Sequence, residues 1–181
     1  MPRASPLPPL DPQALERLAL RYVERYATTR GKLTRYLARK IAERGWAEGA
    51  AAPDPPGLAR RMAELRYVDD RGYAEAKAAA MARRGLGARR IAGALREAGI
   101  DAADSRELAP RIAARARSSA LAFARKRRIG PFATAPADRA ARERALAAMI
   151  RAGHAFDLAR AIITLEPGDE PPCDESFDDC A

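Results

Sequence analysis

The chain has 181 residues, of which 48% are apolar and only 6% aromatic, and its formal net charge is +9. No stretch reaches the ~20 consecutive apolar residues of a membrane-spanning helix, and residues 1–10 lack the apolar core of a secretory signal. Two cysteines, Cys173 and Cys180, are too few for a disulfide framework or a four-ligand metal site. We therefore expect a cytoplasmic protein that holds no metal and contacts no membrane.

Positive charge is concentrated in the body of the chain. Residues 166–181 contain seven of the 24 acidic residues and no lysine or arginine. The other residues therefore carry 33 basic and 17 acidic side chains, a net charge of +16. Such a field favours a polyanion or an acidic protein surface as partner. Because 29 of the 33 basic residues are arginine in an alanine-rich chain, biased coding composition is an equally good explanation of the charge by itself.

Proline marks the first boundary of the fold. Residues 1–10 are predicted to form a disordered leader. A helix begins directly after it, with Asp11 as N-cap and Pro12 at the first helical position. Leu10 and Leu15 are spaced for a hydrophobic staple across this start. The apolar stripe of the helix contains Leu15, Leu18, Tyr22 and Tyr26.

Helical periodicity continues to the end of the basic body, with apolar residues at spacings of three and four. No segment alternates polar and apolar residues with β-branched enrichment, so we expect no strand and predict an all-α fold. A capping box at Asp104 and Glu107 is expected to open one of the helices. The other helices after the first are predicted near residues 31–44, 58–66, 70–84, 87–98, 118–128, 137–152 and 156–165.

Three glycines, Gly45, Gly99 and Gly153, are spaced by 54 residues and each follows an apolar pair with a spacing of four. Glycine adopts the left-handed conformation that ends many helices, and the next residue then packs on the residue five positions before it. This pattern predicts three tandem helical repeats. Their boundaries are predicted at residues 11–66, 67–117 and 118–165, followed by a disordered acidic tail at 166–181.

Catalytic patterns are missing from the sequence. The only histidine, His154, directly follows a helix-ending glycine, where a structural role in the cap is favoured over catalysis. Phosphate-loop, dinucleotide and zinc spacings do not occur, and the segment Gly85–Gly87 is too short for a phosphate loop. We therefore predict a binding protein rather than an enzyme, with no catalytic residue and no cofactor.

The segment 67–74 is the most unusual in the chain and reads Tyr-Val-Asp-Asp-Arg-Gly-Tyr-Ala. In the simpler interpretation one aspartate caps a helix and the apolar side chains fill the core. Since one carboxylate suffices for the cap, the second could instead orient Arg71, or a neighbouring arginine, toward a partner. The simpler interpretation is the better one from this segment alone.

Arginines bracket the Gly85–Gly87 joint between two predicted helices. Arg83 and Arg84 end the first helix, where the helix dipole favours positive charge. Arg89 and Arg90 lie in the opening turn of the next helix, where positive charge is disfavoured by several tenths of a kcal/mol. This placement indicates an anionic ligand. Another helix ends in four consecutive basic residues, more than are needed to cap a helix: Arg125, Lys126, Arg127 and Arg128.

Together these segments resemble the RecX family of recombination regulators. The resemblance is carried by the aromatic–aliphatic–Asp-Asp signature in residues 67–74, then by residues 83–91, Leu95 and Gly99–Ile100. It extends more loosely over nearly all of residues 11–165. His154 departs from it, since an aromatic or aliphatic residue is usual there.

The resemblance implies three tandem three-helix repeats in an elongated, curved array. It also implies a partner, the RecA recombinase filament on single-stranded DNA, and inhibition of filament growth, ATP hydrolysis and strand exchange in recombination and DNA repair. We expect a monomer that contacts the filament through Tyr67, Asp69, Asp70, Arg71, Tyr73, Arg83, Arg84, Arg89 and Arg90. The block 125–128 is expected to contact nucleic acid or an acidic surface.

Two other interpretations remain open. A direct nucleic-acid-binding protein would bind bare DNA with an affinity that falls steeply with salt, because phosphate contacts release counterions. A helical adaptor for another acidic protein is compatible with the composition, although no motif favours it.

Overall fold

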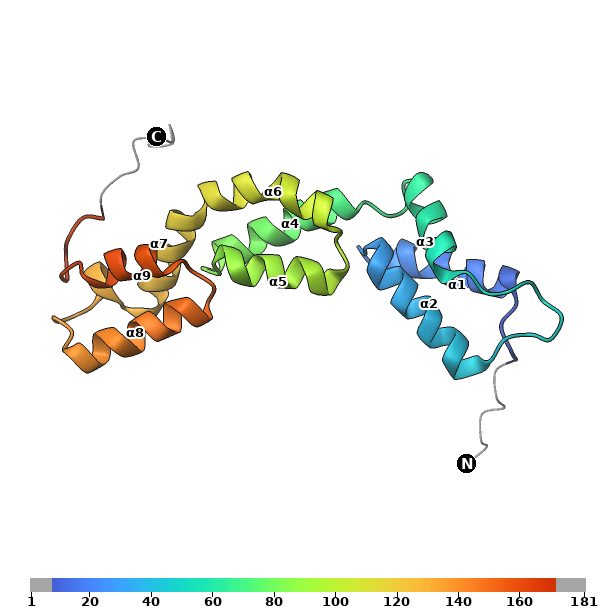
Figure 1. The fold of residues 1–181 in the computed structure, drawn as a ribbon, viewed down its shortest axis with the longest axis horizontal. Coiled ribbons are helices and arrows are strands. Elements are labelled where there is room, and N and C mark those ends of the chain that lie inside the picture. Colours follow the sequence, from blue (N-terminus) through green and yellow to red (C-terminus); the bar gives the residue numbers. More distant parts are fainter. Residues whose placement is uncertain (1–7, 172–181) are drawn as a thin grey trace, which may run out of the picture. The chain divides into compact units, whose positions relative to one another are not determined.

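Nine α-helices and one 3-10 helix make up the regular structure of residues 8–171, the part of the chain that the computed structural model describes (Figure 1). No strand occurs in this range, and the one isolated bridge joins Leu10 to Trp46. The all-α prediction is therefore confirmed. None of the helices in this range is both long and apolar enough to span a bilayer. Residues 1–7 of the predicted leader and 172–181 of the predicted tail lie outside it.

The chain divides into two compact units. The first contains the residues up to Lys77 together with Ala94–Leu108, and the second contains Ala78–Gly93 together with the residues from Ala109 onward. Three helices, α4 (Asp70–Arg83), α5 (Ala88–Ala98) and α6 (Ala102–Ala114), contribute residues to both units. The boundaries proposed for three repeats remain a prediction.

The first unit begins with α1 (Pro12–Arg25), α2 (Arg30–Arg44) and α3 (Pro55–Glu64). A side chain caps each start: Asp11, Thr29 and Asp54 accept hydrogen bonds from the amides of the third residue after them. The predicted Asp11–Pro12 start is confirmed. Helix α3 begins earlier than predicted because the Asp54 cap and the two prolines after it favour a helix start.

Leu10 belongs to the core of the first unit, although the prediction placed it in the disordered leader. Its side chain is fully buried among apolar residues of α1, α2 and α3. Its amide donates to the carbonyl of Gly45 at 3.0 Å, and its carbonyl accepts from the amide of Ala47 at 2.9 Å. The apolar side chain and two backbone hydrogen bonds fix this residue against the end of α2.

Aspartates open two further helices. Asp69 accepts a hydrogen bond from the amide of Gly72 and so caps α4. The predicted capping box at Asp104 and Glu107 is wrong: Asp101 accepts from the amides of Ala103 and Asp104 and caps α6. An aspartate just before the first turn can reach two free amides, which Asp104 cannot do from inside that turn.

The second unit contains α7 (Ala116–Arg127), the 3-10 helix η1 (Gly130–Phe132), α8 (Arg139–Arg151) and α9 (Phe156–Ile163). Small side chains allow these helices to approach closely, because alanine accounts for four of the eight buried residues in the core of this unit. The core contains Ala120, Phe123, Ala124, Met149, Ala152, Ala159, Ile162 and Ile163.

The three periodic glycines all have positive φ, at 79°, 78° and 95° for Gly45, Gly99 and Gly153. After Gly99 and Gly153, the next amide donates to the carbonyl five residues earlier, as predicted. Gly45 differs, because its ψ of 173° leads the chain into the bridge with Leu10. The predicted helix ending is therefore confirmed at two positions and wrong at the first.

A similar joint recurs in both units. In the first, Thr29 donates to the carbonyl of Ala98 at 2.5 Å, and a Cβ on Gly31 would lie only 2.8 Å from the Cα of Gly99. In the second, Gly87 donates to the carbonyl of Ala152 at 2.9 Å and packs on Gly153. Each time, the start of one helix docks on the glycine that ends another, and these two glycines, Gly99 and Gly153, are 54 residues apart.

Candidate partner-binding surfaces

The predicted contact residues fall into two groups. Tyr67, Asp69, Asp70, Arg71 and Tyr73 belong to the first unit. The eight arginines and lysines at 83–90 and 125–128 belong to the second. The two groups are therefore two candidate surfaces, each with its own geometry.

Asp70 is tied to α2. Its side chain is 7% exposed, and Oδ2 lies 2.8 Å from Nε of Arg30 while Oδ1 accepts from the Arg30 amide at 2.8 Å. Arg30 also lies 3.3 Å from Asp101 and 3.8 Å from Asp104. The hydrogen bond with Asp70 raises the pKa of Arg30 above its ordinary value. Asp70 therefore positions Arg30, and little of its carboxylate is left for a partner.

Asp69 and Arg71 lie on the surface of the same segment. Asp69 is used as the helix cap, as both interpretations of the double aspartate require. Arg71 is 67% exposed and pairs with Glu75 at 3.4 Å and Glu107 at 3.2 Å. The second aspartate orients a neighbouring arginine, Arg30, rather than Arg71.

The two tyrosines of the segment differ in exposure. Tyr67 is 53% exposed. The hydroxyl of Tyr73 lies 2.5 Å from Nζ of Lys32, which also lies 4.7 Å from the ring centre, with Lys77 at 5.6 Å. Burial would raise the pKa of Tyr73, but the hydrogen bond and charge of Lys32 and the charge of Lys77 outweigh it and lower the pKa. Tyr73 is thus engaged within the unit, while Tyr67 is open to a partner.

Sequence reasoning missed Arg30, which links α2 to α4 and α6. One signal was available, since Arg30 begins a helix, where the dipole disfavours a cation. The same argument had singled out Arg89 and Arg90. Arg30 meets acidic residues 40 to 74 positions away, and these could not be identified from the local pattern.

In the second unit, the joint between α4 and α5 is held by hydrogen bonds to α7 and to the segment between α8 and α9. Ser119 of α7 donates to the carbonyl of Leu86 at 2.8 Å. The Nε2 of His154 lies 3.0 Å from the carbonyl oxygen of Gly85. The amide of Arg89 donates to the carbonyl of Gly153 at 3.1 Å. The backbone that carries the four arginines is therefore fixed in place.

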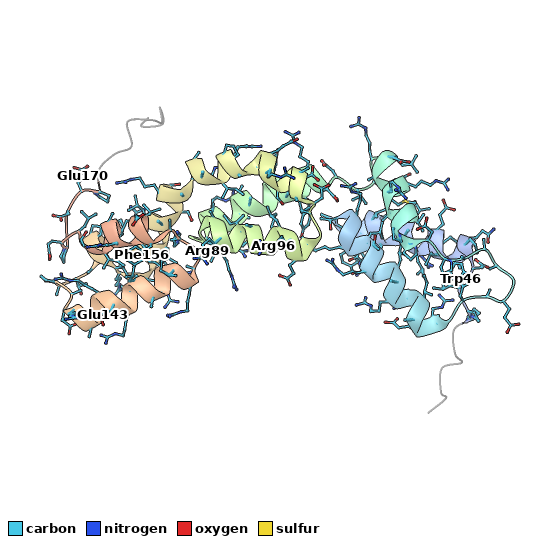
Figure 2. The ribbon with its side chains drawn as sticks, in the orientation of Figure 1. Trp46, Arg89, Arg96, Glu143, Phe156 and Glu170 are labelled. Carbon is cyan, nitrogen blue, oxygen red and sulfur yellow. The ribbon has the colours of Figure 1, made fainter. Side chains whose placement is uncertain are left out.

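Arg83, Arg84, Arg89 and Arg90 are all exposed around this joint, and Figure 2 labels Arg89 at the start of α5. Within residues 8–171, none of the four has an acidic side chain at ion-pair distance. The helix dipole does not favour Arg89 and Arg90 at the opening of α5. No carboxylate among the described residues therefore compensates these charges.

The second basic block lies close to the same joint. Gly85 packs on the backbone of Phe123, and the Arg127 guanidinium, one turn later on α7, lies 5.8 Å from the Phe123 ring centre. Arg125 lies 4.8 Å from the ring of Phe132. We call these eight exposed cations the basic joint surface: Arg83, Arg84, Arg89, Arg90, Arg125, Lys126, Arg127 and Arg128.

His154 has a structural role in the second unit. It is 2% exposed, its amide donates to the carbonyl of Met149, and its ring lies 5.6 Å from that of Phe123. Its Nδ1 atom has no hydrogen-bond partner among the residues that the structure describes. Burial lowers the pKa of His154, although the hydrogen bond to Gly85 opposes this effect.

We expect the free energy of unfolding to decrease as the pH falls below about 6.5, the ordinary pKa of histidine. His154 has a lower pKa in the folded state than in the unfolded state, so the unfolded state is protonated first as the pH falls. Between these two pKa values, protonation stabilises the unfolded state relative to the folded state. The loss is about 1.4 kcal/mol for each unit by which the pKa is lowered. Urea denaturation at pH 7.5 and pH 5.5 measures it. Because His154 is the only histidine in the sequence, His154→Gln should remove this dependence of the unfolding free energy on pH. An equal slope in both proteins would contradict the assignment.

In the described range, no three His, Cys, Asp or Glu side chains lie close enough together to hold a metal ion.

The described residues define an all-α protein with a basic surface built on a buried helix joint. The chain belongs to the RecX family. It is 33% identical over 169 residues to Regulatory protein RecX of Myxococcus xanthus (strain DK1622), covering 87% of this chain and 88% of that protein.

The fold agrees with this assignment. The crystal structure of RecX from Lactobacillus salivarius superimposes with a TM-score of 0.59 and 16% identity, covering 83% of this chain and 93% of that chain. No family model matches the chain. The resemblance found in the sequence is therefore confirmed, and the protein is a regulatory protein of the RecX family.

Proposed function

We propose that this protein binds the RecA recombinase filament and inhibits its growth, ATP hydrolysis and strand exchange. Membership of a family of regulatory proteins supports this role. The observation that carries it is the basic joint surface, where four arginines bracket a rigid joint without an acidic partner among the described residues. A filament of protein on single-stranded DNA offers both acidic side chains and phosphates to such a surface.

The wider biological setting follows from the proposed partner. A protein that acts on recombination filaments works in the cytoplasm, and we propose that it does so as a monomer without a cofactor. Tyr67 and Arg71, both exposed in the first unit, are further proposed contacts. Three residues of the same segment support these contacts from within the unit, because their polar groups are already hydrogen-bonded there: Asp69, Asp70 and Tyr73.

Replacing all four joint arginines by alanine is expected to raise the concentration needed for half-inhibition of RecA ATP hydrolysis by about tenfold or more. Exposed charge pairs contribute about 0.2–1 kcal/mol each, and 1.4 kcal/mol corresponds to a factor of ten. The variant is R83A/R84A/R89A/R90A. The assay measures steady-state ATP hydrolysis on single-stranded DNA, with circular dichroism to confirm helix content.

A matched variant, R139A/R142A/R144A/R160A, removes the same number of exposed charges from α8 and α9 of the same unit. It should inhibit nearly as well as the unmodified protein. If both variants lose inhibition equally, only total charge matters and the joint surface is not the contact. If neither loses it, the contact lies elsewhere.

A further inference from the structure

Three tyrosines and three arginines line an open groove of about 500 Å³ between α1 and α2 in the first unit. The sequence pattern had assigned Tyr22 and Tyr26 to the apolar stripe of α1, but Tyr26 is 49% exposed. A leucine, Leu18, completes the lining by the described residues. The six are Tyr22, Tyr26, Tyr36, Arg21, Arg25 and Arg39.

The tyrosine rings form a continuous aromatic surface across the two helices. Tyr22 stacks on Tyr36 with ring centres 4.1 Å apart and an interplanar angle of 21°. Tyr26 continues the array at 5.2 Å from Tyr22. Tyr22 and Tyr36 pack partly on the core, which fixes the array, whereas half of Tyr26 remains open to solvent. Exposing an aromatic platform of this kind to water costs free energy unless a ligand covers it.

Positive charge surrounds the platform. The Arg25 guanidinium lies 5.6 Å from the ring centre of Tyr26, and that of Arg39 lies 5.8 Å from the ring centre of Tyr36. Of the acidic residues in the described range, only Glu43 pairs with a groove arginine, at 3.4 Å from Arg39, and Glu43 is also held by Lys40 at 2.6 Å. Among residues 8–171, no acidic side chain lines the groove. It therefore combines planar apolar faces with a cationic rim.

We propose that this groove binds single-stranded nucleic acid, with a base stacked on Tyr26 and neighbouring phosphates on Arg21, Arg25 and Arg39. Aromatic faces and basic side chains in one groove are the combination that binds unpaired bases and their backbone. An acidic peptide would use the guanidinium groups but would leave the tyrosine faces without a partner. Duplex bases are stacked on one another, so they cannot use the platform. The groove goes beyond the proposed filament contact, because none of the residues that line it is among the proposed contact residues.

The first test measures binding of a fluorescent oligothymidylate of about 15 nucleotides by anisotropy, without RecA present. Tyr26→Ala should weaken binding about tenfold, the effect expected from losing one stacked base. Tyr26→Phe retains the ring and should bind within about twofold of the unmodified protein. Phe156→Ala removes a similarly exposed aromatic ring outside the groove and should have no effect.

The second test removes the charges. R21A/R25A/R39A should reduce the slope of log affinity against log salt by about 2, since each lost phosphate contact on a single strand contributes about 0.7. The control R60A/R96A/R106A removes three exposed charges of the same unit that do not line the groove. Thermal melting of each variant should show that the fold is retained.

Three outcomes would overturn the proposal. They are unchanged oligonucleotide affinity in Tyr26→Ala, an equal loss in the Phe156→Ala control, and an equal loss with duplex DNA, which offers no free base. If groove variants lose only binding to an acidic peptide, the groove is a protein site instead. Because no filament is present, failure here leaves the ATP hydrolysis test of the joint arginines unaffected.

Discussion

Gly87→Ala is expected to lower the free energy of unfolding by roughly 3 kcal/mol, at the upper end of the cost of overpacking a core. A Cβ at this position would overlap the backbone of Gly153 and the amide of His154. Since the obstacle is main chain rather than a flexible side chain, the helix start has to move. That movement would also stretch the hydrogen bond from Gly87 to Ala152.

Gly93→Ala is the matched control on the same helix. A Cβ on Gly93 would meet nothing within 4 Å. In an open helix interior, alanine is favoured over glycine by about 0.5–1 kcal/mol, so this variant should be slightly more stable than the unmodified protein. Urea denaturation followed by circular dichroism measures both variants. Similar effects of the two substitutions would contradict the close packing of the joint.

Under the proposed function, the same joint links inhibition of RecA to the stability of the second unit. Arg89 and Arg90 follow Gly87 directly, and their backbone position depends on the contact with Gly153. A variant that opens the joint should therefore weaken inhibition of RecA even though every arginine is present. The arginine variant, in contrast, should lose inhibition at unchanged stability.

Local signals explain what the sequence predicted well. Helix starts such as Asp11–Pro12 and ends such as Gly99 depend on residues within one or two turns, so their chemistry is visible in a short window. The exposure of the joint arginines follows from their charge in the same way. The fold class followed from these signals together with the absence of strand patterns.

Long-range contacts explain what the sequence did not predict. Gly45 is followed by a different turn from Gly99 because Leu10, 35 residues earlier, donates to its carbonyl. Asp70 is internal because Arg30 reaches it from another helix. The tyrosine platform forms because Tyr22 and Tyr36 meet across two helices. Each of these depends on which helix faces meet, and a local pattern carries no information about that.

Leu10→Ala is expected to lower the free energy of unfolding by about 2–5 kcal/mol, the range for removing a fully buried leucine side chain. The side chain is 0% exposed and packs on the core of α1, α2 and α3. The truncation leaves a cavity, because the backbone hydrogen bonds with Gly45 and Ala47 hold the segment where it is. Surrounding side chains therefore cannot collapse fully into the space.

The single tryptophan makes this effect measurable in the unit where it arises. Trp46 lies in the bridge opposite Leu10, and its indole donates to the carbonyl of Ala51 at 3.0 Å. Trp46 fluorescence during urea denaturation should therefore report a lower midpoint for Leu10→Ala. Leu65→Ala, in which the leucine is 54% exposed, should change the free energy by less than about 0.5 kcal/mol. If the two leucine variants unfold at the same urea concentration, Leu10 contributes no more than a flexible leader would.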